Sequence, residues 1–111
     1  MASTRQLRIA RLIQKELGDI FLTYARNFHG TLITVSEVRV SSDLSIARVY
    51  LSIFPTEQAQ GVTEQINSDV RSIRGLLGNR VRHQLRIVPE LNFYLDDTLD
   101  QLQHIDELLH E

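Results

Sequence analysis

The spacing of apolar residues changes along this chain from a helical period to a strand period and back, and this order constrains the fold most. Between Arg5 and Tyr24, apolar residues recur every three or four positions, which is typical of a helix with one buried face. Thr31–Val40 and Ile46–Phe54 are rich in β-branched residues and flank a polar segment, so they predict a hairpin. We therefore expect a mixed α+β fold that begins with a helix and two strands.

The hairpin carries three more specific signals. In its second strand Arg48 and Tyr50 take the phase that faces solvent, so only one face of the sheet should be buried. In its first strand the apolar phase changes at 36–37, which predicts a β-bulge. Asp43 lies in the connecting turn, where we expect its carboxylate to accept local hydrogen bonds.

A second helical period runs from Val62 to Val81, and Thr56 or Thr63 could cap this helix. Gly75 and Gly78 within it each cost about 1 kcal/mol relative to alanine. They indicate a kink or a close approach of the backbone to another surface, or they are simply tolerated.

The last part of the chain predicts a third strand, from Leu85 to Leu95, and a final helix. Pro89 cannot donate to a β-ladder, so it should lie at an edge or at the start of that strand. We divide the chain into a folded domain, residues 1–95, and an acidic C-terminal helix, residues 96–111, packed on the domain or extending from it.

The length suffices for one such domain. The chain has 111 residues, of which 42% are hydrophobic, and no cysteine, which excludes disulfides, thiolate-bound zinc and a cysteine nucleophile. Its apolar runs are too short for a membrane span or a signal peptide, so we expect a cytoplasmic protein. We also expect this protein to fold as a monomer. One core should collect Ile13, Leu17, Val49, Leu51, Ile73, Leu77 and Phe93.

Charge is distributed unevenly between the two parts of the chain. Residues 1–89 hold all 12 basic residues and 7 acidic ones, a net charge of +5, whereas residues 90–111 hold 7 acids and no lysine or arginine. Eleven of the basic residues are arginines, whose planar guanidinium suits phosphate. The distribution favours a polyanionic partner, and an ordinary solvated surface is the alternative.

Two stretches resemble the ribosome-binding factor A family, bacterial assembly factors of the small ribosomal subunit. Residues 38–50 are similar to the family's strand, Ser-x-Asp-Leu turn and Ala-x-Val-Tyr strand, and residues 73–93 to its arginine-bearing helix followed by Pro-Glu-Leu-x-Phe. The resemblance covers most of residues 5–95. It implies a type II KH-like domain, in the order helix, strand, strand, kinked helix and strand, with a C-terminal helix.

The kink is where this sequence departs from the family pattern. In the family an Ala-x-Gly break replaces the Gly-x-x-Gly loop of KH domains, but the corresponding residues here are 69–71, Asp-Val-Arg. Residues 75–78 have Gly-x-x-Gly spacing, yet their two leucines are expected in the core. Ser68 or Ser72 could serve instead, so the sequence leaves the position of the kink open.

The resemblance implies a factor that binds the immature 30S subunit and its 16S rRNA, assists late maturation or rRNA processing, and then leaves. Small-subunit ribosomal proteins are further candidate partners. Arg74 is the strongest RNA-binding candidate, and its alternative role is a bridge to Glu90 or Asp96. The full predicted set, most of it in two rows at helical spacing, is Arg5, Arg8, Arg11, Lys15, Arg71, Arg74, Arg80, Arg82 and Arg86.

Nothing in the sequence indicates catalysis. The four histidines lack the spacing of metal ligands, and no glycine-rich phosphate loop follows a strand. We expect no enzyme, no cofactor, no metal site and no small-molecule substrate. The alternative function is a small α+β protein interaction or dimerisation module that uses its sheet face and does not bind RNA.

Overall fold

The computed structural model of the protein describes residues 3–96, so the predicted C-terminal helix lies outside the described residues except for Asp96. The order of elements is the predicted one, with the second helix broken in two. The elements are α1 (Thr4–Tyr24), a short 3-10 helix η1 (Ala25–Asn27), β1 (Leu32–Val40), β2 (Ile46–Phe54), α2 (Thr56–Ser68), α3 (Val70–Val81) and β3 (Glu90–Leu95).

The three strands form one sheet in the order β1-β2-β3, with β1 and β2 antiparallel and β2 and β3 parallel. A parallel pair needs a crossover, and α2 with α3 supplies it. The predicted start of the third strand at Leu85 is wrong, because pairing begins only at Glu90. Pro89 has no N–H to donate, so the ladder starts directly after it. This is the strand order and helix count of a type II KH-like domain.

The predicted bulge in β1 is confirmed and keeps one face of the strand apolar throughout. The register with β2 shifts between Val35 and Glu37. Because of the extra residue, Ile33 and Val35 before the shift and Val38 and Val40 after it are all buried. Without the bulge, half of these side chains would point to solvent.

The two long helical segments begin differently. Ser3 caps α1, where its Oγ accepts from the N–H of Gln6 at 3.1 Å and Gln6 Oε1 accepts from the N–H of Ser3 at 2.8 Å. The predicted cap at Thr56 or Thr63 is wrong. The backbone of Pro55 precedes α2, and the Thr63 hydroxyl donates instead to the carbonyl of Ala59, one turn back.

The helical kink lies at Asp69, within the segment that the resemblance selects. This residue separates α2 from α3 with φ −95° and ψ 12°. Its carboxylate accepts from the Tyr24 hydroxyl at 2.7 Å and from the Gln65 amide at 3.1 Å, and these bonds lower the pKa of Asp69. Burial, and then Asp69, raises the pKa of Tyr24. Gly75 and Gly78 lie within the continuous helix α3 and make no kink. A Cβ atom added at Gly78 would lie 3.5 Å from the Val88 side chain, which is an ordinary van der Waals contact, so no close approach requires glycine there.

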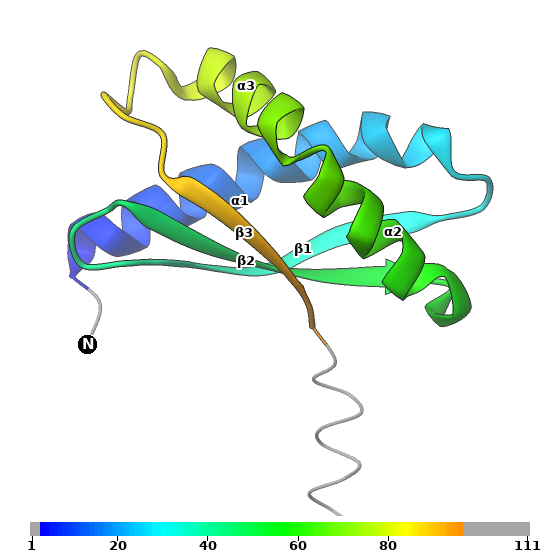
Figure 1. Ribbon diagram of the computed structural model, residues 1–111. Helices are drawn as coiled ribbons and strands as arrows, with labels where there is room; N and C mark the ends of the chain where they lie inside the picture. The colour runs from blue at the N-terminus through cyan, green and yellow to red at the C-terminus, as the bar shows by residue number, and fades with distance from the viewer. Residues whose placement is uncertain (1–2, 97–111) are drawn as a thin grey trace, which may run out of the picture.

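The core lies between the sheet and the helices, and all seven residues of the predicted core set are buried there. Of the two leucines at 75–78 that were expected in the core, Leu77 is buried, but the expectation for Leu76 is wrong because its side chain is 52% exposed. Figure 1 shows the helices on one side of the sheet, where α1 packs on β1 and α2 packs on β2 and β3. Phe21 of α1 meets Phe93 of β3 edge to face, with ring centroids 5.8 Å apart. The other side of the sheet has no helix among residues 3–96. None of the helices in that range is long and apolar enough to cross a membrane.

Candidate nucleic-acid interface

The outer side of α1 carries a row of exposed cations. We call this set the α1 row: Arg5, Arg8, Arg11 and Lys15. The apolar residues of α1 face the sheet, so helical geometry directs these long side chains outward. Ion pairs within residues 3–96 involve other cations, and none of these four takes part in one. The charge of the α1 row is therefore not offset by a neighbouring carboxylate of the described chain.

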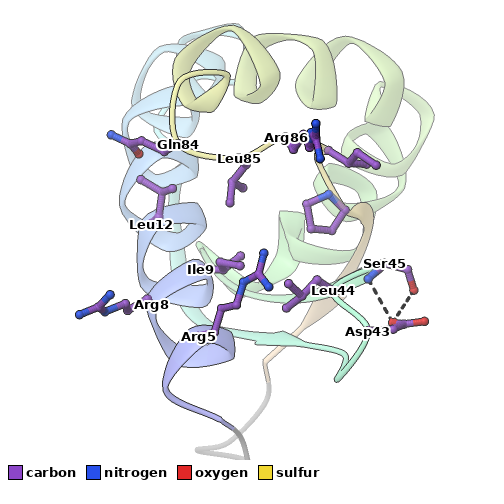
Figure 2. A pocket seen from close by; sticks show the side chains of 12 residues that line it. Arg5, Arg8, Ile9, Leu12, Asp43, Leu44, Ser45, Gln84, Leu85 and Arg86 are labelled. Atoms are coloured by element: carbon purple, nitrogen blue, oxygen red, sulfur yellow. Dashed lines mark hydrogen bonds between the residues drawn. The ribbon is translucent and has the colours of Figure 1, made fainter.

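Two members of the α1 row stand at the rim of a pocket of about 590 Å³, which we call the α1 pocket. Its walls are the first half of α1, the turn at 43–45 and the connection from α3 to β3. Figure 2 shows Arg5 and Arg8 on the α1 side and Arg86 on the side of the connection. Between these cations the pocket is apolar, lined by Ile9, Leu12, Leu44, Leu85, Ile87 and Pro89.

A turn with several local hydrogen bonds forms one wall of the α1 pocket. Asp43 Oδ1 accepts from the N–H of Ser45 at 3.1 Å and from the hydroxyls of Ser45 and Ser41, each at 2.7 Å. The hydroxyls and the N–H lower the pKa of Asp43 from 3.8 to about 2. Leu44 has a positive φ of 64° and lines the pocket. The predicted local role of Asp43 is therefore confirmed.

Arg74, the strongest single candidate from the sequence, is bonded to its own chain. Its Nε donates to the carbonyl of Pro89 at 3.1 Å, and its Nη2 donates to the carbonyl of Val88. These bonds hold the connection from α3 to β3, and with it a wall of the α1 pocket, against α3. The alternative bridge from Arg74 to Glu90 or Asp96 is wrong, because the partners of Arg74 are carbonyl oxygens and no ion pair within residues 3–96 involves it. The Asp96 carboxylate accepts instead from the Ser36 hydroxyl at 2.6 Å.

Arg80 of α3 forms ion pairs with two acids of α1. Its Nη1 lies 3.2 Å from Glu16 Oε2 and 3.6 Å from Asp19 Oδ2, both on α1. The two acids that share α1 with the α1 row are thus engaged by a cation from α3. Arg80 consequently holds α3 on α1, and its own charge is offset.

The remaining predicted residues lie along the other flank of α3. At 3.6 residues per turn, Arg71, Arg74 and Arg82 project from the side of the helix opposite Arg80, and therefore away from α1. Arg71 and Arg74 line a smaller groove of about 290 Å³ beside Val88. The two predicted rows therefore lie on two flanks of the helical layer, and Arg86 joins the α1 row at the α1 pocket.

Sequence reasoning missed the apolar lining of the α1 pocket. Ile87, which is 77% exposed, was expected inside a strand, but it lies in the connection that precedes β3. The one signal for this placement was Pro89, which marks the start of pairing. No group of three or more histidine or acidic side chains that could hold a metal occurs within residues 3–96.

The sequence is similar to known proteins along nearly its whole length. The family model described as ribosome-binding factor A matches residues 5–109, nearly the whole chain. The chain belongs to the ribosome-binding factor A family. A family member from Cytophaga hutchinsonii is 46% identical over 110 residues, which cover 98% of this chain and 83% of that protein.

Solved structures of the family share the fold. The crystal structure of ribosome-binding factor A from Thermus thermophilus superposes with a TM-score of 0.67 at 26% identity and covers 81% of this chain and 94% of that one. A homology model of the Thermus thermophilus factor, fitted into the cryo-electron microscopy map of a 30S complex, gives 0.59 at 29% identity and covers 85% and 93%. The resemblance stated from the sequence is confirmed.

Proposed function

We propose that this protein binds the immature 30S ribosomal subunit in the cytoplasm, contacts its 16S rRNA and assists late maturation as a monomeric, non-catalytic factor. Membership of the ribosome-binding factor A family supports the ribosomal target. A related factor from Thermus thermophilus has been fitted into the map of a complex with 30S.

The observation that carries the RNA contact is the α1 row beside the α1 pocket. Four exposed cations and Arg86 lack carboxylate partners in the described chain, whereas Glu16 and Asp19 are engaged by Arg80. Arginines of this kind bind phosphates and fix the orientation of the protein on RNA. RNA loops and ends also offer unstacked bases, and an apolar pocket rimmed by arginines suits one.

Sedimentation with ribosomal subunits tests this function. The full chain is mixed with small subunits from assembling cells, with mature small subunits and with buffer alone, and each mixture is run on a sucrose gradient. We expect comigration with the immature subunits that weakens as salt is raised, because phosphate contacts release counterions. Failure to comigrate at low salt, together with a protein mass that rises with concentration, would instead support the protein interaction module.

A further inference from the structure

The side of the sheet that faces away from the helices, which we call the open face, presents polar and aromatic side chains in rows across the strands. Side chains alternate along each strand, so the residues between the buried core positions point to this side. Two adjacent rows are chemically distinct. One contains Arg39, Arg48 and Asn92, and the next contains Glu37, Tyr50 and Tyr94.

The first row sets two arginines directly opposite each other. Arg39 and Arg48 are register partners on β1 and β2, and Asn92 is the partner of Arg48 on β3. Like charges in this position destabilise a sheet. Glu37 bonds to Arg39 at 3.0 Å, but no ion pair within residues 3–96 involves Arg48. Both arginines line a hollow of about 250 Å³, together with Val40, Ser41 and Ile46 at the end of the hairpin. Its volume is sufficient for an anion that would relieve this repulsion.

The second row is an aromatic platform. The rings of Tyr50 and Tyr94 are stacked, with centroids 5.6 Å apart and planes inclined at 29°. Arg39 Cζ lies 5.9 Å from the centroid of the Tyr50 ring, and Tyr94 on the edge strand is 44% exposed. Two residues along a strand span about 6.6 Å, so the aromatic row lies next to the arginine row.

We infer that the open face binds single-stranded RNA. A phosphate occupies the hollow between Arg39 and Arg48, the attached base stacks on Tyr94, and the Asn92 amide is placed to bond a base edge. Paired arginines favour a polyanion, and exposed aromatic rings favour nucleobases. The inference rests on the proposed function for its ligand class, RNA, but it concerns the opposite face of the domain.

The test compares two fluorescent probes on the full-length protein: a ten-nucleotide oligoadenylate and an abasic strand of the same length and charge. For Tyr94→Leu we expect at least about fivefold weaker binding of oligoadenylate, the usual effect of losing one stacked base, and no change with the abasic strand. Phe54→Leu is the matched control, because Phe54 is an exposed aromatic residue of β2 outside both rows. It should leave both affinities unchanged.

Arg48→Gln supplies an independent variant should Tyr94→Leu fail to fold. It should lower the salt slope of binding to both probes by about 0.7, as expected for one phosphate contact with a single strand. Arg26→Gln, which removes the same charge from η1, should not change the slope.

Three results would overturn the inference. One is that the wild-type protein does not bind oligoadenylate at low salt. Another is that Tyr94→Leu and Phe54→Leu weaken binding equally. The third is that Tyr94→Leu and Arg48→Gln reduce association with small subunits but not with oligoadenylate, which would assign the open face to a protein partner. Each of these results leaves the proposed function standing if charge removal from the α1 row still reduces comigration with small subunits.

Discussion

Arg8 and Arg80 are the same residue type on neighbouring helices, and both were predicted to contact RNA, but their surroundings differ. Arg80 lies between Glu16 and Asp19 of α1 and ties the two helices together. Arg8 is exposed at the rim of the α1 pocket and forms no ion pair within residues 3–96. Helical spacing alone therefore does not separate a cation that holds the fold from one that can bind a ligand, because the difference lies in the partner that the tertiary structure supplies.

Arg74 extends this comparison to backbone partners. It is exposed, as Arg8 is, yet two of its donors are used by carbonyl groups of the connection that leads to β3. Arg71, one turn earlier on the same flank, forms no hydrogen bond or ion pair within the described chain. Arg71 and Arg74 are thus both exposed, but Arg74 holds the connection to β3 whereas Arg71 has donors free to bind a ligand.

The largest effect is expected from Arg74→Ala. Because the carbonyls of Val88 and Pro89 lose their donor, the free energy of unfolding should fall by about 1–2 kcal/mol. Denaturant titration measures this change, and Arg71→Ala is the control that should leave stability unaltered. Arg74→Lys keeps the charge but loses the planar fork, so it should remain destabilised. Unchanged stability with weaker RNA binding would make Arg74 an RNA contact instead.

A smaller effect is expected from Arg80→Gln. The ion pairs of Arg80 are partly exposed, so their loss should lower the free energy of unfolding by about 0.2–1 kcal/mol. Salt should reduce the difference between variant and wild type, since it screens exposed pairs. Thermal unfolding at two ionic strengths provides the measurement. A salt-independent loss would argue that packing of the Arg80 stem, rather than its charge, joins the helices.

The smallest effect on stability is expected at Asp43, which lines the α1 pocket and accepts hydrogen bonds from Ser41 and Ser45 of its own turn. Its folded-state pKa is lowered, so its ionised form stabilises the fold above pH 3.8, and this contribution is lost as the pH falls toward 2. The difference in melting temperature between wild type and Asp43→Asn should therefore shrink between pH 5 and pH 2. If the variant kept the melting temperature at pH 7 but no longer associated with small subunits, the turn role would not explain Asp43.

Much of the fold could be predicted because its signals are local. Periodicity identified α1 and the hairpin, and a change of phase identified the bulge in β1. The family resemblance offered 69–71 as one candidate for the kink and left its position open, and the structure has the break at Asp69. The cap of α2 and the start of β3 were wrong. A proline lies at each of these two places. Pro55 occupies the cap position of α2, so Thr56 is already inside the helix, and Pro89 has no N–H to donate, so β3 begins only at Glu90.

The candidate site was harder to predict, since it depends on how distant segments meet. The sequence does not reveal that Arg80 reaches acids 61 and 64 positions earlier, or that Arg74 faces carbonyls 14 and 15 positions later. The apolar lining of the α1 pocket comes from α1, a turn and a connection that share no local pattern. On the open face, by contrast, the strand alternation of Arg48 and Tyr50 was a usable signal.

Salt dependence of binding to immature small subunits tests the central claim most directly, with Arg8→Gln and Arg80→Gln compared side by side. Each variant removes one arginine charge from neighbouring helices, so net charge is matched. If the α1 row binds rRNA phosphates, Arg8→Gln lowers the salt slope by about 0.7–0.9 and leaves the melting temperature unchanged, whereas Arg80→Gln lowers the melting temperature and leaves the slope unchanged. Equal slopes for both variants and the wild type, or an equal loss in both variants, would contradict this division.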